Sequence, residues 1–566
     1  AGKTTQSENS VAVGTLAGQT TQGSYSIAIG PSSGKISQGS QSIALGNQTG
    51  LTSQGASSIA IGSSSGKISQ AQQSIAIGNN AGQDSQQGNS VALGTGAGRY
   101  QQKTNSVAIG ATAGATEQGL YSVAIGSTAG RDSQGADAIA VGTQAGKFSQ
   151  GNYSVAIGKE AGRTSQDSSS VAIGRLAGEI NQGIPNPEPV YSAIWPGTGS
   201  SVAIGDHAGK TDQQFASVAI GYNAGRDSQG LMSTAIGYNA GKFAQGFAAV
   251  AVGMSAQRNT HSANSYSVAV GYNCGQDSQQ SSSVAIGNGA GQTRQGQSSV
   301  GIGQYAGQTS QGTSSVAIGY FAAPSSQGAA AVAIGNRAGH STQGADAVAI
   351  GQLAGTTSQG TLAVAIGNVA GQTTQAEYSV AVGYKAGKTT QGTNSVAVGR
   401  ESGETDQGAS CVAIGIRTGA SLQSNNCVAI GNQSGQTSQG DQGVAIGLFA
   451  GQTSQGDNSI AIGNRAGQTG QSVGSIVLNS SGSAVNITAA GDIKIESTSA
   501  FLRYTVGGGW SSSTAISNPS DETLKKNIAI IPDALDKVNT LRGVTFNWKD
   551  DERDAGVIQT GLIAQD

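Results

Sequence analysis

A short word of alternating aliphatic and small residues recurs along the chain every sixteen positions. Residues 150–174 read QGNYSVAIGKEAGRTSQDSSSVAIG and contain the word SVAIG twice. With occasional substitutions, the pattern [VI]-A-[IVL]-G occurs 28 times between residues 11 and 463, and a divergent copy, IVLN, follows at residues 476–479. The main interruption is a long interval between Val171 and Val202. So regular a period predicts one repetitive architecture rather than several globular domains.

Each word alternates as a β-strand does, so Val155 and Ile157 share one face while Ser154 and Ala156 share the other. A sixteen-residue unit fits one coil of a β-solenoid, with two short strands and two turns. Since Val and Ile are the only regular aliphatic residues of the coil, we expect them to line the interior and to stack about 4.8 Å from those of the next coil. The Ser/Ala/Gly face would then form an outer stripe for packing against another chain.

The second half of the coil reads A-G-x-[TD]-[ST]-Q-G, in which a glycine such as Gly162 suits a corner with positive φ. A glutamine, such as Gln150 or Gln166, stands five residues before nearly every word. In register, these amides can hydrogen-bond along the rod as a ladder, which we favour over ligand binding. The sequence leaves open whether this column lies inside the coil or at a corner.

Composition supports a fibrous structure and excludes several functions. Glycine accounts for 90 of 566 residues, aromatic residues for 4% and charged residues for 11%, which is unlike a protein with aromatic-rich globular cores. The strict phase of the β-branched residues argues against disorder. The net charge of −2 gives no field that favours nucleic acid, and no apolar run is long enough to span a membrane. We find no motif for a metal ion or a cofactor.

Two groups of aromatic residues are candidate binding positions. The interval at about residues 183–200 is proline-rich and carries Tyr191 and Trp195, so it could contact a receptor or a glycan, or serve equally well as a stiff spacer. Tyr222 and Tyr238 follow the word in adjacent coils and should stack. A stacked pair could bind a sugar, although shielding of the strand ladder is the favoured interpretation.

Two further sets of residues recur at the same coil position and are assigned structural roles. Cys411 and Cys427 share a coil position where Ser or Ala is usual, so a small-residue substitution is favoured over a disulfide, although their expected spacing is within disulfide range. Lys147 and Arg163 share another position and are interpreted as a solvated edge that discourages sheet aggregation.

The repeated NSVAIG motif resembles the head repeats of trimeric autotransporter adhesins, which form left-handed parallel β-rolls. The longer unit with AGQTSQG is also similar to repeats in fibre proteins of phages and large viruses. The resemblance implies an all-β, left-handed parallel β-roll or β-solenoid of sixteen-residue coils in a trimeric fibre, followed by a small α+β segment. It does not choose between the two families.

The C-terminal sequence differs from the repeats. GDIKIES (491–497) and FLRYTV (501–506) alternate as strands, and residues 507–520 indicate a linker. The words SDETLKKNI, ALDKVNTLRGVTFNWK and GLIAQD then resemble the intramolecular chaperone of the peptidase S74 type. Here we expect a helix over about Asp533 to Leu541 and a strand over Val544–Trp548. Because the family's domain normally extends beyond the IAQD word, we expect residues 520–566 to be its truncated N-terminal part.

In that family the chaperone trimerises the fibre and then releases itself by cleavage before a serine. The resemblance implies that Ser520 is the nucleophile and Lys525 the general base, acting on the carbonyl of Pro519. The alternative is that Ser520 caps a turn and Lys525 is a solvated charge. Some family members also use a histidine, and none follows Ser520 here.

These observations predict three parts: a rod over residues 1–479, a β-rich neck over 480–519 and the chaperone segment over 520–566. The function expected is that of a structural fibre on a virion surface or phage tail. It would be a homotrimer that presents or spaces an attachment surface for a cell-surface glycan or protein receptor and contacts other virion or tail proteins, with no turnover chemistry beyond self-cleavage. The alternative is an adhesin on a bacterial surface, and a glycan depolymerase on a solenoid is less favoured because no carboxylate pair recurs.

Overall fold

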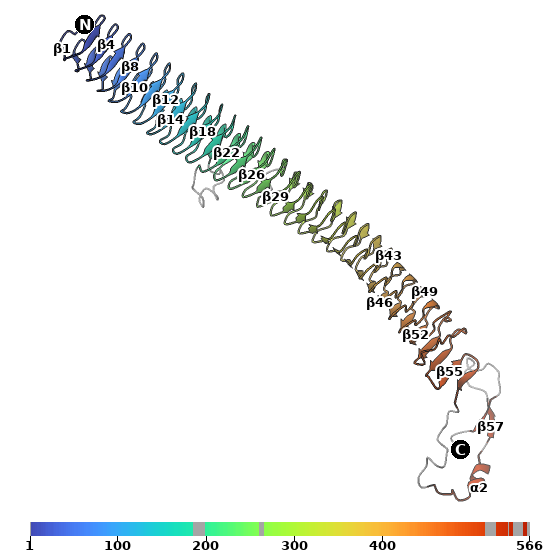
Figure 1. Ribbon diagram of the computed structural model, residues 1–566. Coiled ribbons are helices and arrows are strands. Elements are labelled where there is room, and N and C mark those ends of the chain that lie inside the picture. Colours follow the sequence, from blue (N-terminus) through green and yellow to red (C-terminus); the bar gives the residue numbers. More distant parts are fainter. Residues whose placement is uncertain are drawn as a thin grey trace.

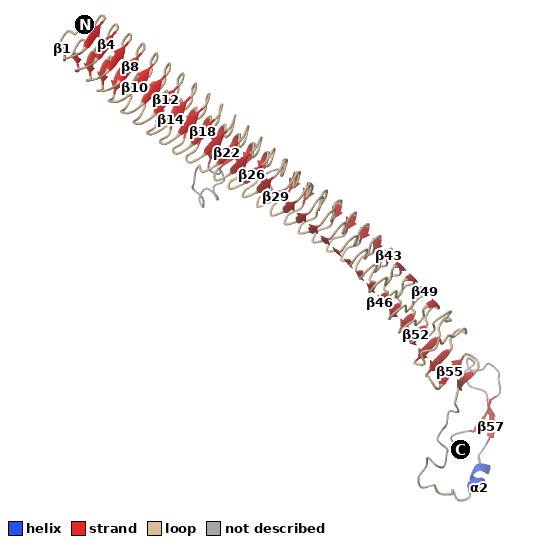
Figure 2. Cartoon of the chain, in the orientation of Figure 1, coloured by secondary structure: helices blue, strands red, loops and turns tan. Residues whose placement is uncertain are grey.

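The computed structural model is a long, gently curved rod made almost entirely of short strands (Figure 1, Figure 2). It describes residues 2–184, 199–259, 265–514, 528–541, 543–546 and 559–562. The predicted β-solenoid of sixteen-residue coils is confirmed, since Val155 pairs with Val171 and Ile157 with Ile173 in a parallel ladder.

Each coil contributes two strands. The first comes from the SVAIG word, as in β18 (Val155–Ile157), and the second ends at the glutamine, as in β19 (Thr164–Gln166). The word strands form a parallel ladder that begins at β2 (Val11–Val13) and reaches β54 (Ile493–Glu496). The second strands form shorter parallel sheets, of which the nine-stranded one runs from β35 (Ser326–Gln327) to β51 (Thr453–Gln455).

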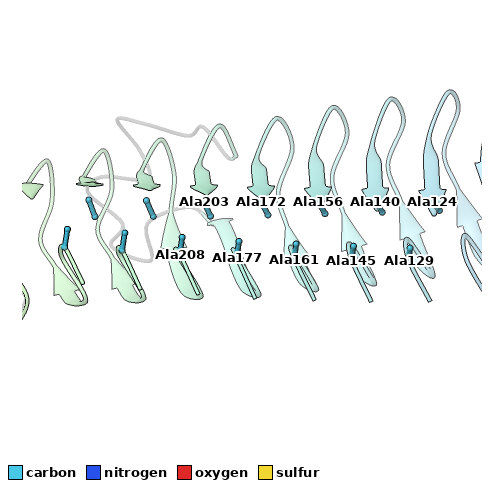
Figure 3. Packing of buried hydrophobic residues seen from close by; sticks show 14 of the residues in the cluster. Ala124, Ala129, Ala140, Ala145, Ala156, Ala161, Ala172, Ala177, Ala203 and Ala208 are labelled. Carbon is cyan, nitrogen blue, oxygen red and sulfur yellow. The ribbon is translucent and has the colours of Figure 1, made fainter. Parts of the chain in front are cut away.

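Alanine, serine and glutamine fill the interior of the rod. Ala156 of the word and Ala161 of the next turn are both 0% exposed, and the rows to which they belong face each other across the coil (Figure 3). Ser154 is also 0% exposed, whereas Ile157 is 38% exposed. The expectation that Val155 and Ile157 line the interior is therefore wrong, and so is the expectation that the small-residue face lies outside.

The narrow spacing between the two walls explains this arrangement. A Cβ atom built on Gly162 would lie 3.3 Å from the Cβ atom of Ala156 and 2.5 Å from Oε1 of Gln166. A space of this width accommodates small side chains and amides, and a large aliphatic side chain such as that of Ile would force the walls apart. Because Ala156 points inward, strand alternation directs Val155 and Ile157 outward.

The glutamine column lies inside the coil and forms the expected ladder. Nε2 of Gln166 donates hydrogen bonds to the carbonyl oxygens of Val155 (2.9 Å) and Ser170 (3.2 Å), and to Oε1 of Gln182 in the next coil (3.1 Å). Gln166 is 1% exposed. The bond to Val155 ties the two walls of one coil together, while the bonds to Ser170 and Gln182 reach the next coil.

The glycine that ends each word is required by close contact between coils. Gly158 has φ of 128°, and a Cβ atom there would lie 2.5 Å from the carbonyl oxygen of Gly174 in the following coil. A side chain at Gly158 would therefore be strained and would collide with the backbone.

The long interval after Val171 leaves the ladder unbroken. β20 (Val171–Ile173) pairs in register with β22 (Val202–Ile204) as though the two words were sixteen residues apart. The second strand of that coil, β21 (Ile180–Ile184), also pairs with its successor across the interval. The rod therefore continues past this interval with the same geometry.

The parallel ladder ends in a small antiparallel meander. β53 (Ile476–Asn479) pairs in parallel with β54, and β54 then pairs antiparallel with β55 (Phe501–Thr505). β55 continues to β56 (Gly509–Ser512). The strands predicted over 491–497 and 501–506 are thus observed. Asp492, which is 1% exposed, anchors the meander by accepting hydrogen bonds from Arg503 Nη2 (2.7 Å) and the Val506 amide (3.1 Å).

The C-terminal segment has mixed secondary structure. The predicted helix is observed as α2 (Ala534–Asn539), and the predicted strand overlaps β57 (Gly543–Phe546). β57 pairs antiparallel with β58 (Gln559–Leu562). The segment is therefore α+β in character, unlike the rod.

Candidate functional site

The outward aliphatic pairs form a continuous apolar stripe along the rod, which we call the aliphatic stripe. It consists of the first and third residues of every word. The third residue is among the large exposed hydrophobic residues in many coils, for example Ile29, Ile125, Ile157, Ile286, Ile366 and Ile462. In-register pairing places each of these side chains beside its equivalent in the next coil, so the exposed apolar surface is unbroken over many coils.

A surface of this kind indicates a protein contact. Soluble monomers rarely expose contiguous apolar patches larger than a few hundred Å². The contact surface is the aliphatic stripe and not the Ser/Ala/Gly face, because that face fills the coil. The sequence carried a signal for this arrangement. Through residue 466, the interior positions represented by Ala156 and Ala161 hold only Gly, Ala, Ser, Cys or Thr, which indicates crowding, whereas Val, Ile and Leu exchange freely at the stripe.

Tyr222 and Tyr238 stack as expected. Their ring centroids lie 5.2 Å apart with an interplanar angle of 11°, and the rings are 45% and 51% exposed. Beside them, Nδ2 of Asn223 donates a hydrogen bond of 3.1 Å to Oδ1 of Asn239, which holds the two turns in register. Tyr191 and Trp195 lie outside the described residues. Sugar binding by these aromatic residues stays a prediction.

Ser520 and Lys525 also lie outside the described residues, so the geometry of the dyad is not tested. The described part of this segment presents apolar side chains to solvent. Ile530 is 94% exposed, and Leu535 and Val538 of α2 are 73% and 59% exposed. A six-residue helix gains stability only from packing. These residues therefore need a partner surface to form a core.

The cysteines substitute for small interior residues. The Sγ atom of Cys411 donates a hydrogen bond of 2.7 Å to the Ser424 carbonyl, as Ser395 Oγ does to Gly408 at 2.6 Å one coil earlier. Cys411 and Cys427 are both buried and free, which confirms the small-residue interpretation. Burial also raises the pKa of the Cys274 thiol to about 12, so this thiol is unreactive in the folded protein.

Neither a metal cluster nor a membrane-spanning helix is found in the described part of the chain. Among the described residues, no three His, Cys, Asp or Glu side chains gather in a way that could hold a metal ion. Within the same residues, no helix combines the length and apolarity that a membrane crossing requires.

These features define a class of protein: a fibrous β-solenoid with a small-residue interior and an exposed apolar stripe. The YadA head domain repeat matches residues 102–129, 375–402 and 453–466, and the chaperone of endosialidase family, peptidase S74, matches residues 520–566. No curated protein and no solved structure matches the chain significantly. The two family matches confirm both resemblances. The chain carries adhesin-type head repeats together with a chaperone segment.

Proposed function

We propose that the chain forms a homotrimeric extracellular fibre of a virus or phage, which presents or spaces a host-attachment surface. The observation that carries this proposal is the aliphatic stripe, because it is apolar, continuous and unpartnered within one chain. Three rods packed along their stripes would remove it from water, at roughly 25 cal/mol per Å² of apolar surface. Head repeats of the adhesin type support the same assembly.

The proposed organisation has three parts. Residues 1–479 form the rod, residues 480–519 form the neck, and residues 520–566 belong to a chaperone that brings the chains together. The exposed apolar side chains of Ile530, Leu535 and Val538 support this role, since they would be buried by packing between chains. Contact with other virion or tail proteins would anchor the fibre.

Self-cleavage before Ser520 would release the chaperone once the fibre has assembled. The neutral amine of Lys525 would take the proton of the Ser520 hydroxyl, and the hydroxyl oxygen would attack the Pro519 carbonyl. Lys525 would return this proton to the nitrogen of Ser520, so that the peptide bond between Pro519 and Ser520 breaks to leave a free α-amine and an ester on the Ser520 oxygen. Water then hydrolyses the ester to a carboxyl group on Pro519 and restores the Ser520 hydroxyl. The match to the chaperone family over residues 520–566 supports this reaction.

Attachment would use side chains on the flank of the rod. Tyr222 and Tyr238 offer a stacked pair of partly exposed rings. Tyr191 and Trp195, in the long interval of the sequence before Val202, are further candidates. A cell-surface glycan or a protein receptor is the proposed partner, since aromatic rings with a polar edge suit both.

A second candidate is an adhesin on a bacterial surface, favoured by the head-repeat matches at three places in the rod. Light scattering and intact mass of the same full-length preparation test the main proposal. It predicts a particle of three chains for both proteins, with a chain mass of 55.7 kDa for uncleaved Ser520→Ala and a shorter chain for the wild type. A monomer would contradict the trimeric fibre, and equal chain lengths would contradict self-cleavage.

A further inference from the structure

A column of basic side chains follows the wall of the rod that carries the second strands. In the coils between Arg131 and Phe243, one residue separates the A-G turn from the second strand. In eight successive coils this position holds seven basic residues, interrupted once by Glu179. We call them the basic column: Arg131, Lys147, Arg163, Lys210, Arg226, Lys242 and Arg258. Backbone hydrogen bonds from Asp132 N to Lys147 O (2.9 Å) and from Phe148 N to Arg163 O (2.8 Å) place them on successive rungs, about 4.8 Å apart.

The charge of this column is only partly neutralised. The carboxylate of Glu179 forms ion pairs with Arg163 at 2.8 Å and with Lys210 at 3.5 Å. The single acidic residue at this position therefore neutralises only its two neighbours in the column. Within the described parts of the chain, Lys147, Lys242 and Arg258 have no ion-pair partner. A row of like charges at this spacing costs free energy unless an anion lies against it.

The end of the column near Arg258 is the most crowded. Burial lowers the pKa of Lys242, the positive charges of Arg226 and Arg258 lower it further, and Asp227 opposes them. Among the described residues, the buried Nε–H groups of Arg226 and Arg258 have no hydrogen-bond acceptor, and Arg226 Nε lies 3.6 Å from Oδ1 of Asp227. Three cations on consecutive rungs thus share one nearby carboxylate, and two of them carry an unsatisfied donor.

A groove lies two residues further along the same strands. Ser133, Ser149 and Ser165 line it together with Gln150, Gln166, Asp167 and Ile184, and its volume is about 360 Å³. Hydroxyl groups therefore repeat with the same rung spacing beside Arg131, Lys147 and Arg163. A ligand along the column could hydrogen-bond to hydroxyls while its anions meet the cations.

The basic column stays accessible when the rods assemble. It lies on the wall of the second strands, while the aliphatic stripe lies on the wall of the word strands. The Gln166 side chain spans the interior between these walls, so their outer surfaces face opposite directions. Packing through the stripe leaves the basic column on the outside.

We propose that the basic column and the serine-lined groove beside it bind a linear acidic polysaccharide that lies along the rod. A pyranose unit in an extended polysaccharide is about as long as one rung is high. Successive anionic sugars can therefore meet successive cations. This inference deepens the proposed attachment function by naming its ligand class, and it rests on that function only for the biological role of the ligand.

Nucleic acid fits the column less well. Outside it the chain has no excess of positive charge, since the net charge of the whole is −2. The rings next to the column are also occupied: Lys147 lies 4.8 Å from the ring centroid of Phe148, and Lys242 lies 4.7 Å from that of Phe243. These faces are therefore not free to stack on bases.

The test replaces the three crowded cations in the full chain, as Arg226→Gln/Lys242→Gln/Arg258→Gln. Glutamine is compatible with this position, because Gln276, Gln292 and Gln308 occupy it further along the rod and hydrogen-bond to one another at 3.1 and 3.0 Å. The matched control removes the same charge from the turns after the word, as Arg337→Gln/Arg400→Gln/Arg465→Gln. Unchanged circular dichroism and light scattering would show that both variants fold and assemble like the wild type.

Binding is measured by calorimetry with heparin, a sulfated polymer, with polygalacturonate, a carboxylated one, and with neutral dextran and duplex DNA. We expect at least one acidic polysaccharide to bind the wild type and the control variant, with at least tenfold weaker binding by the column variant, and no binding of dextran. Lys242→Arg should keep the affinity within about twofold. Equal loss in both triple variants, no binding of either acidic polysaccharide, or tighter binding of DNA would overturn the proposal. If binding fails while the particle remains trimeric, the proposed fibre stands and only the ligand assignment falls.

Discussion

The side-chain amide of Gln166 donates a 2.9 Å hydrogen bond to the carbonyl oxygen of Val155, and thereby joins the two walls of one coil. The same nitrogen lies 3.1 Å from Oε1 of Gln182 in the next coil. One buried side chain therefore fixes both the width of the coil and the register of its neighbour. In a rod without an aliphatic interior, these bonds replace the packing that normally decides which residues meet.

Replacing Gln166 by leucine should loosen the rod locally. The Val155 and Ser170 carbonyls would lose their bonds to this side chain, and an unsatisfied buried polar group costs about 1–3 kcal/mol. Because each coil contacts only its neighbours, the effect should be confined to residues near the substitution. Hydrogen exchange followed by mass spectrometry should show faster exchange in peptides around residues 150–182 and no change near residue 400. Uniform exchange rates along the chain would contradict the role assigned to the glutamine ladder.

Enlarging an interior alanine should be more harmful than altering the stripe. Ala156→Val adds two methyl groups where the walls already touch, and overpacking typically costs about 1–3 kcal/mol. Ile157→Val removes one methylene group from a side chain that is 38% exposed in the single chain. Limited proteolysis should cut the first variant faster near the substituted coil and leave the second like the wild type. The opposite order would mean that the aliphatic pair, and not the alanine, is inside.

The meander after the rod should loosen in acid. The hydrogen bond from Arg503, together with that from the Val506 amide, holds the pKa of Asp492 below its ordinary value of 3.8. Because the carboxylate is favoured in the folded state, its contribution is present above that ordinary value and is lost as the pH falls through the lowered one. Asp492→Asn should remove the acid dependence and loosen β55 at neutral pH. Protection factors of the β55 amides between pH 2 and pH 6, which correct for the chemical exchange rate at each pH, measure both effects. An acid loss of protection that is equally large in the variant would refute the assignment.

The Cys274 thiol should resist alkylation. Its pKa is raised by burial to about 12 from an ordinary value of 9.0. The neutral thiol is favoured in the folded state, so its contribution is intact below pH 9 and is lost as the pH rises toward about 12. Iodoacetamide at pH 8 should label Cys274 only after unfolding. Rapid labelling in the native protein would place this side chain at the surface.

The period, the β-solenoid and the Tyr222–Tyr238 stack were predictable from the sequence, because spacing alone places equivalent residues on successive rungs. The direction in which the aliphatic side chains point, outward and not into the coil, was not predictable in this way. The prediction assumed that the most apolar residues must be inside, but the width of the coil is set by Ala156, Ala161 and the buried amide of Gln166, which leave no room for Ile157. In an oligomer the apolar residues can be buried between chains rather than within one. The sequence also did not reveal that the basic column is only partly neutralised, because this depends on which carboxylates lie within ion-pair distance of its side chains in the folded rod.

The most direct test of the central claim is disulfide cross-linking of single cysteines placed on the two walls, with Cys274, Cys411 and Cys427 replaced by serine. Under mild oxidation, Ile157→Cys on the aliphatic stripe should give cross-linked chains on a non-reducing gel, and Thr164→Cys on the opposite wall should stay uncross-linked. Cross-linking through Thr164→Cys alone, or through neither position, would contradict an assembly held together by the outward aliphatic pairs.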